Sequence, residues 1–239
     1  MILEICVFNI TDVILAKNGG ADRIELCASY FEGGITPSHA LITETFKYVD
    51  PENIVVMIRP RGGDFIYDDY EFEVMRNDIQ HCKELGVKNL IFGISLPDGK
   101  LNAKRNKDLI ELAFPMHCTL QRAFDLTPDP LEALRSAIDC GFKRILTSGQ
   151  QASVMEGKEL IKKLIDAAEN QIVILPGAGI TSKNAEELIR STNCREIHTS
   201  AKMYAPVNHD FREGIYDFSH LTMVNEEEVK LLKEITNRY

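Results

Sequence analysis

The chain has 239 residues, of which 44% are hydrophobic and 26% are charged, and its formal net charge is −9. This length and composition are typical of one globular domain, and α/β barrels commonly have about 200–250 residues. The acidic excess argues against nucleic acid or an anionic membrane surface as a partner, and no apolar run approaches the ~20 residues of a membrane span.

The N-terminus and the cysteines predict a cellular compartment. The chain enters a strand pattern at once, with no basic segment before it, which predicts that there is no signal peptide. The six cysteines show no Cys-x-x-Cys spacing; they are Cys6, Cys27, Cys82, Cys118, Cys140 and Cys194. Without a secretion signal, such a set indicates reduced thiols in a cytoplasmic protein.

Strand and helix patterns alternate along the whole chain. The periodicity predicts strands over 2–7, 22–27, 54–58, 89–92, 117–121, 144–147, 172–175 and 195–199. It predicts helices over 11–18, 39–48, 70–85, 104–113, 130–140, 154–169, 182–191 and 225–236, the first capped by Thr11 or Asp12. A stretch of more than twenty residues before the last helix has no regular pattern.

Strict alternation of this kind predicts parallel strands joined by helices. Eight such units favour a closed eight-stranded (β/α)8 TIM barrel, a single domain over 1–239 in which 200–239 form an extended segment and the final helix. The alternative is an open doubly wound sheet, which needs a glycine-rich turn after the first strand to bind a dinucleotide. Val7–Ile10 is not such a turn, so we expect no nucleotide cofactor.

The stretch Asp22–Cys27 is the most informative of the strands. It alternates charged or soft side chains with Ile24 and Leu26. The pattern fits an edge strand with one face in water, or a barrel strand whose polar face points to the centre. In a barrel, Ile24 and Leu26 lie under the helices, while Arg23, Glu25 and Cys27 face inward. Glu4 and Cys6 repeat the pattern on the first strand, which suggests one shared site.

Other polar residues also stand at the predicted carboxyl ends of strands, where TIM barrels have their active sites. Glu4, Glu25 and His198 are candidates for acid–base chemistry. Arg59, Arg122 and Asp125 are further candidates for catalytic residues, and Arg59, Arg61 and Arg122 would add positive charge for binding a carboxylate or phosphate. Each of these residues, taken alone, is equally compatible with a structural role.

A second group of residues follows the last two strands. Gly177 and Gly179 free backbone N–H groups before a predicted helix, and Ser200 follows the eighth strand. Barrel phosphate sites are often built from the loops after strands seven and eight, and helix N-termini favour anions. The pattern therefore predicts an anion site, with a tight strand-to-helix turn as the alternative.

Cys6 and Cys27 occupy matching positions on sequential strands. Neighbouring strands lie about 4.8 Å apart, so two inward sulfurs could share a metal ion. Two thiolates suit a soft ion such as Cu(I). The alternative is ordinary packing, because free cysteine behaves as a small hydrophobic residue. The other four cysteines are interpreted as packing residues.

The sequence resembles the copper homeostasis protein CutC family over nearly the whole chain. The motifs that carry the resemblance are Glu4–Cys6, Gly19–Cys27, Gly33–Ser38, Met57–Phe65, Arg122–Asp125, Arg144–Gly149, Pro176–Ile180 and Glu196–Ser200. The resemblance implies a cytosolic (β/α)8 barrel, a homodimer or higher homo-oligomer, and a role in copper homeostasis with Cu(I) bound at Cys6 and Cys27. Gln121 departs from it, because the family tends to have histidine before Arg-Ala-Phe-Asp. If that histidine is a ligand or an acid–base group, the activity is lost or altered here.

Two functions therefore remain open at the level of the sequence. One is a Cu(I)-binding homeostasis protein, and the other is a lyase or isomerase acting on a small phosphorylated or carboxylated substrate. The first leaves Arg59, Arg122 and the Gly177 turn unexplained, and the second leaves the cysteine pair as mere packing. The partner is accordingly a copper ion or a small anionic ligand.

Overall fold

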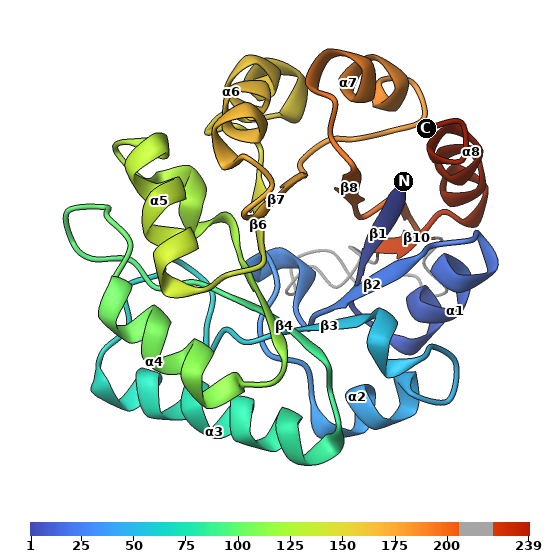
Figure 1. Cartoon of the computed structure of the whole chain (residues 1–239). Coiled ribbons are helices and arrows are strands. Elements are labelled where there is room, and N and C mark those ends of the chain that lie inside the picture. The colour runs from blue at the N-terminus through green and yellow to red at the C-terminus, as the bar shows by residue number, and fades with distance from the viewer. Residues whose placement is uncertain (206–221) are drawn as a thin grey trace, which may run out of the picture.

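The computed structural model of the chain describes residues 1–205 and 222–239. Eight parallel strands form a nearly closed barrel, and eight α-helices surround it as an outer ring (Figure 1). The view in Figure 1 is along the barrel axis, onto the end at which the strands begin. The prediction of a parallel (β/α)8 barrel is confirmed.

The strands of the barrel are short, and most have four residues. They are β1 (Ile2–Val7), β2 (Arg23–Leu26), β3 (Ile54–Met57), β4 (Asn89–Phe92), β5 (His117–Leu120), β6 (Arg144–Thr147), β7 (Val173–Pro176) and β8 (Glu196–Thr199). They are hydrogen-bonded in the order β7-β6-β5-β4-β3-β2-β1-β8. A parallel bridge between Gly177 and His198 joins the two ends of this order, so the seam of the barrel lies between β7 and β8.

Each barrel strand is followed by one of the α-helices of the outer ring. These are α1 (Ile10–Asn18), α2 (His39–Thr45), α3 (Asp69–Leu85), α4 (Ala103–Ala113), α5 (Pro130–Cys140), α6 (Val154–Ala168), α7 (Ala185–Thr192) and α8 (Glu226–Thr236). Short 3-10 helices occur at η1 (Tyr30–Glu32), η2 (Pro51–Asn53) and η3 (Arg122–Leu126). Within the described residues, no helix is both long enough and apolar enough to span a membrane.

Some predicted boundaries were wrong. The first helix is capped by Asn9, whose side chain accepts a hydrogen bond from the Asp12 backbone N–H, and neither Thr11 nor Asp12 is the cap. Helix α7 begins at Ala185 and not near Ser182. The stretch predicted as irregular contains a hairpin of β9 (Lys202–Tyr204) and β10 (Thr222–Val224). The remainder of that stretch, 206–221, lies outside the described residues.

The interior has two layers, which explains the alternation in the strands. Ile24 and Leu26 pack in the large apolar layer between the sheet and the helices. A smaller cluster fills the inside of the barrel; it consists of Cys6, Cys27, Val55, Met57, Ile91, Leu146 and Leu175. Because successive side chains of a strand point to opposite faces, Glu25 shares the inner side with Cys27. The predicted inward orientation is confirmed.

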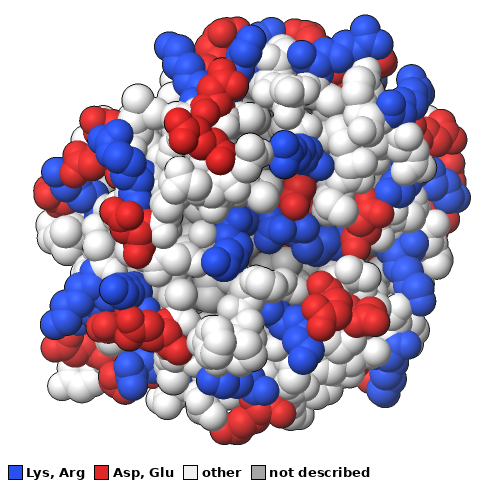
Figure 2. Space-filling model, viewed as in Figure 1, with Lys and Arg blue, Asp and Glu red and all other residues white. Residues whose placement is uncertain are grey.

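Charge is distributed unevenly over the surface despite the net charge of −9. Figure 2 shows acidic and basic side chains interspersed around the rim of the viewed face, with Lys and Arg side chains gathered near the barrel axis. Basic residues stand at or next to the amino ends of several strands: Arg23, Lys88, Lys143, Arg144 and Arg195. The net charge of the chain therefore does not by itself describe the end of the barrel at which the strands begin.

Candidate functional site

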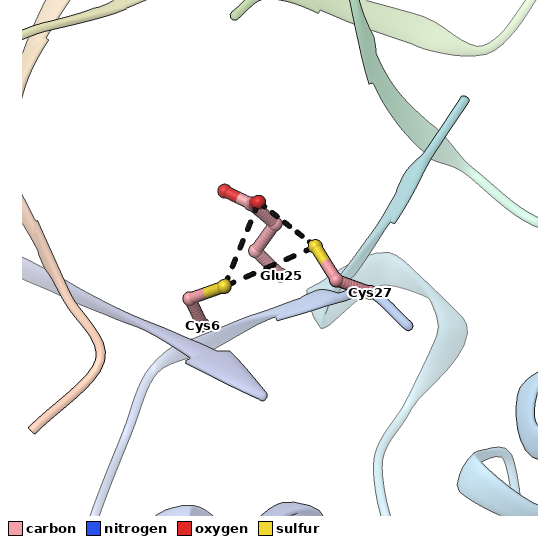
Figure 3. A group of neighbouring side chains, drawn as sticks. All are labelled: Cys6, Glu25 and Cys27. Atoms are coloured by element: carbon pink, nitrogen blue, oxygen red, sulfur yellow. Dashed lines mark hydrogen bonds between the residues drawn. The ribbon is translucent and has the colours of Figure 1, made fainter. Parts of the chain in front are cut away.

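Two thiols and a carboxyl group meet inside the barrel (Figure 3). The sulfurs of Cys6, on β1, and Cys27, directly after β2, are 3.9 Å apart. Glu25 Oε1 lies 3.7 Å from the Cys6 sulfur and 3.1 Å from the Cys27 sulfur. All three side chains are buried, and their donor atoms are close enough together to hold one metal ion. The register that pairs Cys6 with Glu25 across the two strands produces this cluster.

Glu25 also belongs to a second buried cluster, with Glu4 and His198. His198 Nδ1 lies 2.7 Å from Glu4 Oε1 and 3.4 Å from Glu25 Oε2. Glu25 Oε2 has no hydrogen-bond partner among the described residues. The strand pairing brings these residues together, because Glu4 on β1 stands opposite His198 on β8. Glu25 thus connects a sulfur cluster with a carboxylate–imidazole cluster.

The protonation states of these groups follow from burial and charge. Burial raises the pKa of Glu25, and the negative charge of Glu4 adds to this effect while His198 opposes it. Burial alone would lower the pKa of His198, but the charge of Glu25 and the contacts with Cys6 and Glu4 raise it well above its usual range. Burial raises the pKa of the Cys27 thiol well above its usual range, and Cys6 and Glu25 raise it further. Burial thus opposes a negative charge on Glu25 and on Cys27, whereas the surrounding acidic groups favour a positive charge on His198.

A chain of buried ion pairs supports this site from the amino end of the barrel. The Arg23 guanidinium donates to both Glu4 and Glu196. Arg144 also donates to Glu196, at 2.6 and 3.1 Å. Burial alone would raise the pKa of Glu4, but Arg23 and His198 outweigh it and lower that pKa. Positive and negative side chains alternate along this line and form ion pairs, which offset the free-energy cost of burying each charge.

A pocket of about 770 Å³ lies beside the site, at the carboxyl ends of β7 and β8. Its wall includes Cys6 and His198, so the buried clusters border it. The predicted anion-binding residues Gly177, Gly179 and Ser200 also line it. Three basic side chains contribute to the same wall: Arg122, Lys183 and Lys202. The pocket is therefore polar and carries cationic groups.

Lys183 and Lys202 were not predicted as site residues. Lys183 is exposed in the loop between β7 and α7, and Lys202 begins β9, with its ammonium group 4.2 Å from the centre of the Tyr30 ring. Only the hairpin and the loop bring them to the pocket. In the sequence, the only indication for Lys202 was its position two residues after Ser200, at the mouth of the predicted barrel.

The loop after β7 already holds a carboxylate from α8. The Ser182 backbone N–H donates to Glu228 at 2.6 Å, and the Ser182 hydroxyl donates to the same carboxylate at 2.9 Å. Gly177 N–H is also used, because it donates to Thr147 O on β6. Since α7 begins only at Ala185, the glycine turn does not lead directly into a helix N-terminus. An anion in this pocket would depend mainly on side-chain cations.

Arg122 and Asp125 lie together and form hydrogen bonds with each other and with Ser148. Arg122 donates to Asp125 at 2.8 Å and to the Ser148 hydroxyl at 2.9 Å. Asp125 also accepts from Thr147 and from the backbone N–H groups of Ser148 and Gln150. Asp125 is thus occupied with holding the loop after β6, and it positions Arg122 at the pocket.

Arg59 and Arg61 lie away from the pocket wall. The Arg59 guanidinium is buried and donates to the carbonyl groups of Glu32, Gly34 and Gly63. Arg61 pairs with Glu71 at the start of α3. Both arginines hold loops at the end of β3, and the structure does not bring them together with Gly177 or Ser200.

Gln121 stands where the family resemblance leads us to expect histidine. Its side chain is buried, and Nε2 lies 3.4 Å from the carbonyl oxygen of Gly93. It is absent from the pocket wall within the described part of the chain. The remaining cysteines are buried free thiols in the outer layer of the core, as expected for packing residues.

Comparisons with known proteins place this barrel in a family. The model of the CutC family matches residues 1–203. The copper homeostasis protein cutC homolog of Mus musculus is 42% identical over 213 residues, which are 89% of this chain and 78% of the mouse protein. The Homo sapiens homolog is 41% identical over the same shares of the two chains. The chain belongs to the CutC family.

Solved structures agree with this assignment. The crystal structure of CutC from Streptococcus agalactiae superposes with a TM-score of 0.80 at 30% identity, covering 84% of this chain and 98% of that one. Phosphoribosyl anthranilate isomerase from Thermotoga maritima superposes with a TM-score of 0.61 at 11% identity over the full length of both chains. The latter likeness concerns the TIM-barrel fold alone.

Proposed function

We propose that this CutC protein serves copper homeostasis by binding Cu(I) through the thiolates of Cys6 and Cys27. The observation that carries the proposal is the 3.9 Å separation of the two sulfurs inside the barrel. Two sulfurs on one ion are at most about 4.6 Å apart when each metal–sulfur bond is about 2.3 Å. The pair satisfies that bound without rearrangement. The relatives in mouse and human, both named copper homeostasis proteins, support the same function.

The donor set also fits the ion. Thiolates are soft ligands and select Cu(I) over harder ions. Both sulfurs are buried, which would protect a bound Cu(I) from water. Glu25 contacts both thiols and is placed to accept a proton when a thiolate forms, with His198 beside it. Metal binding at cysteine requires such a loss of protons.

The test is an anaerobic competition between the reduced protein and a chromogenic Cu(I) chelator. The wild type is expected to remove about one Cu(I) per chain from the chelator. A Cys6→Ser, Cys27→Ser double variant should remove none, because hydroxyl groups are poor ligands for a soft ion. Cys118→Ser is the matched control, since Cys118 is an equally buried thiol of the outer layer. Unchanged binding in the double variant would eliminate these ligands.

A second candidate function is an enzyme of the lyase or isomerase type that acts on a small phosphorylated or carboxylated substrate. The observation that favours it is the pocket with three cationic side chains beside an acid–base pair. Arg122 could bind the anionic group with its planar guanidinium. Glu25 and His198, whose pKa values are both raised, would move a proton.

Inorganic phosphate is a suitable first probe for this second function. We expect calorimetry to detect binding at millimolar phosphate, and we expect Arg122→Met together with Lys183→Met to weaken it about tenfold or more. Lys162→Met is the control, because Lys162 is an exposed lysine on α6, outside the pocket wall. Binding that survives the double substitution would mean that these cations do not hold the phosphate. Absence of binding by the wild type would assign the pocket a structural role and leave the copper function alone.

A cytoplasmic location and a homodimeric or larger assembly accompany both proposals. Free buried thiols suit a reducing compartment. The oligomeric state stays a prediction, which light scattering coupled to gel filtration would measure.

A further inference from the structure

His39 and His81 form a pair on the outer surface, away from the barrel interior. His39 is the first residue of α2, and His81 lies in the last third of α3. These two helices are neighbours in the outer ring (Figure 1). His39 Nδ1 and His81 Nε2 are 2.9 Å apart, the ring centres are 5.1 Å apart, and the ring planes are inclined by 39°.

A carboxylate lies next to this pair. Asp78 precedes His81 by one turn of α3, so both side chains lie on the same face of the helix. Burial raises the pKa of Asp78, while a hydrogen bond with Thr36 and the charge of His81 act against that rise. Thr36 precedes α2, so the loop before one helix and the face of the other enclose the carboxylate.

The stability of the fold does not require this pair. Both histidines are exposed, so water competes with their hydrogen bond, and its net contribution to the stability of the fold is small. The nitrogen that accepts the hydrogen bond between the two rings is unprotonated. Its lone pair is therefore available to a metal ion when the hydrogen bond is broken. Two imidazole nitrogens and a nearby carboxylate are the common ligands of divalent transition metals.

The distance between the two nitrogens suits a shared ion. Metal–nitrogen bonds of about 2.0–2.1 Å at right angles, as in the tetragonal sites of Cu²⁺, place two ligand nitrogens about 2.9 Å apart. The nitrogen that donates this hydrogen bond binds an ion once its proton moves to the other nitrogen of the same ring, and a rotation of the exposed rings then turns both lone pairs toward one ion. We propose that His39 and His81 form a surface site for a divalent transition-metal ion, and that the nearby negative charge of Asp78 strengthens the binding of the cation. Among first-row ions, Cu²⁺ binds such nitrogen and oxygen donors most tightly. The site is independent of the proposed Cu(I) site, which uses sulfur.

The experiment is a calorimetric titration of the full chain with Zn²⁺, which is redox-inert. We expect about one Zn²⁺ per chain, with the affinity reduced about tenfold or more in His39→Ala and in His81→Ala, and a smaller loss in Asp78→Asn. His117→Ala is the matched control, because His117 is also an exposed histidine, at the start of β5. The Cys6→Ser, Cys27→Ser variant should keep this site, which separates it from any Zn²⁺ bound by the buried thiols.

Cu²⁺ provides a second measurement, which would give no signal from a histidine pair that has only a structural role. The electron paramagnetic resonance spectrum of the wild type should show coupling to two nitrogens, and each single histidine variant should lose one of them. Circular dichroism of every variant checks that the fold is kept. The proposal is overturned if Zn²⁺ affinity is unchanged in both single variants, or if His117→Ala weakens it equally.

Discussion

Glu25 is the residue on which the two buried clusters depend. Its Oε1 contacts both thiols, while its Oε2 faces His198 without a hydrogen bond from any described residue. Burying an ionised carboxyl group with an unpaired oxygen costs free energy. Such a group in a folded protein therefore suggests a functional role. In the copper proposal it relays a thiol proton that is then released, and in the enzymatic proposal it exchanges a proton with a substrate. The same position thus serves both candidates.

The raised pKa of Cys27 predicts a pH dependence of Cu(I) binding. Burial keeps this thiol protonated at neutral pH, so the ion must displace a proton. The apparent affinity should therefore rise with pH, by about tenfold per pH unit for each proton released. Chelator competition at several pH values between 6 and 9 (roughly the range below the thiol pKa) measures the slope. A flat profile would mean that the ion is not held by these thiolates.

At the scale of elements, the contact between α6 and the loop after β6 places Arg122 at the pocket. Gly157 on α6 packs so closely that an added Cβ would lie 2.0 Å from the Ser148 carbonyl oxygen and 2.8 Å from the Gly149 Cα. Ser148 in turn bonds to Arg122 and Asp125. Only glycine allows the helix to approach this loop.

Gly157→Ala is expected to lower the free energy of unfolding by about 1–3 kcal/mol, because the backbone of the loop must shift to admit the methyl group. Urea denaturation measures the loss. Glu159→Ala is the control, since it adds an alanine at an exposed position of the same helix. If Gly157→Ala is as stable as the control, then the close approach does not constrain the loop.

At the scale of the whole molecule, a line of buried charges runs inside the barrel from Arg144 through Glu196, Arg23 and Glu4 to His198. It joins strands that are distant in sequence, β1, β2, β6 and β8. Burial alone would raise the pKa of Glu196, but Arg144 and Arg23 outweigh it and lower that pKa below the usual 4.5. Glu25, whose pKa is raised, has the opposite effect, because its protonation at lower pH favours the folded state over the unfolded state.

The lowered pKa values of Glu4 and Glu196 predict sensitivity to acid. A carboxyl group with a lowered folded-state pKa stabilises the fold fully above its unfolded-state pKa, here 4.5, and loses this contribution as the pH falls below that value. The free energy of unfolding should therefore decline below pH 4.5. Glu196→Gln should make this decline shallower, whereas the exposed Glu159→Gln should leave its slope unchanged. Equal slopes in all three proteins would disprove the role of the network.

The sequence by itself determined the fold and the content of the inner cluster. Period-two alternation in Asp22–Cys27 and the regular succession of strands and helices favoured a closed barrel, and the barrel placed Cys6, Glu25 and Cys27 on its inner side. These features are local, because each depends on the spacing of side chains along one segment.

The tertiary structure alone decided which polar residues meet. Arg59 and Arg61 stand at a strand end like Arg122, yet they bind loop carbonyls and Glu71, because the loops after β3 fold back over them. Lys202 reaches the pocket only through a hairpin that no pattern predicted. His39 and His81 are 42 residues apart, and only the packing of α2 beside α3 brings their nitrogens to 2.9 Å. Contacts of this kind depend on how loops close and helices pack, and the periodicity of a single segment carries no information about either.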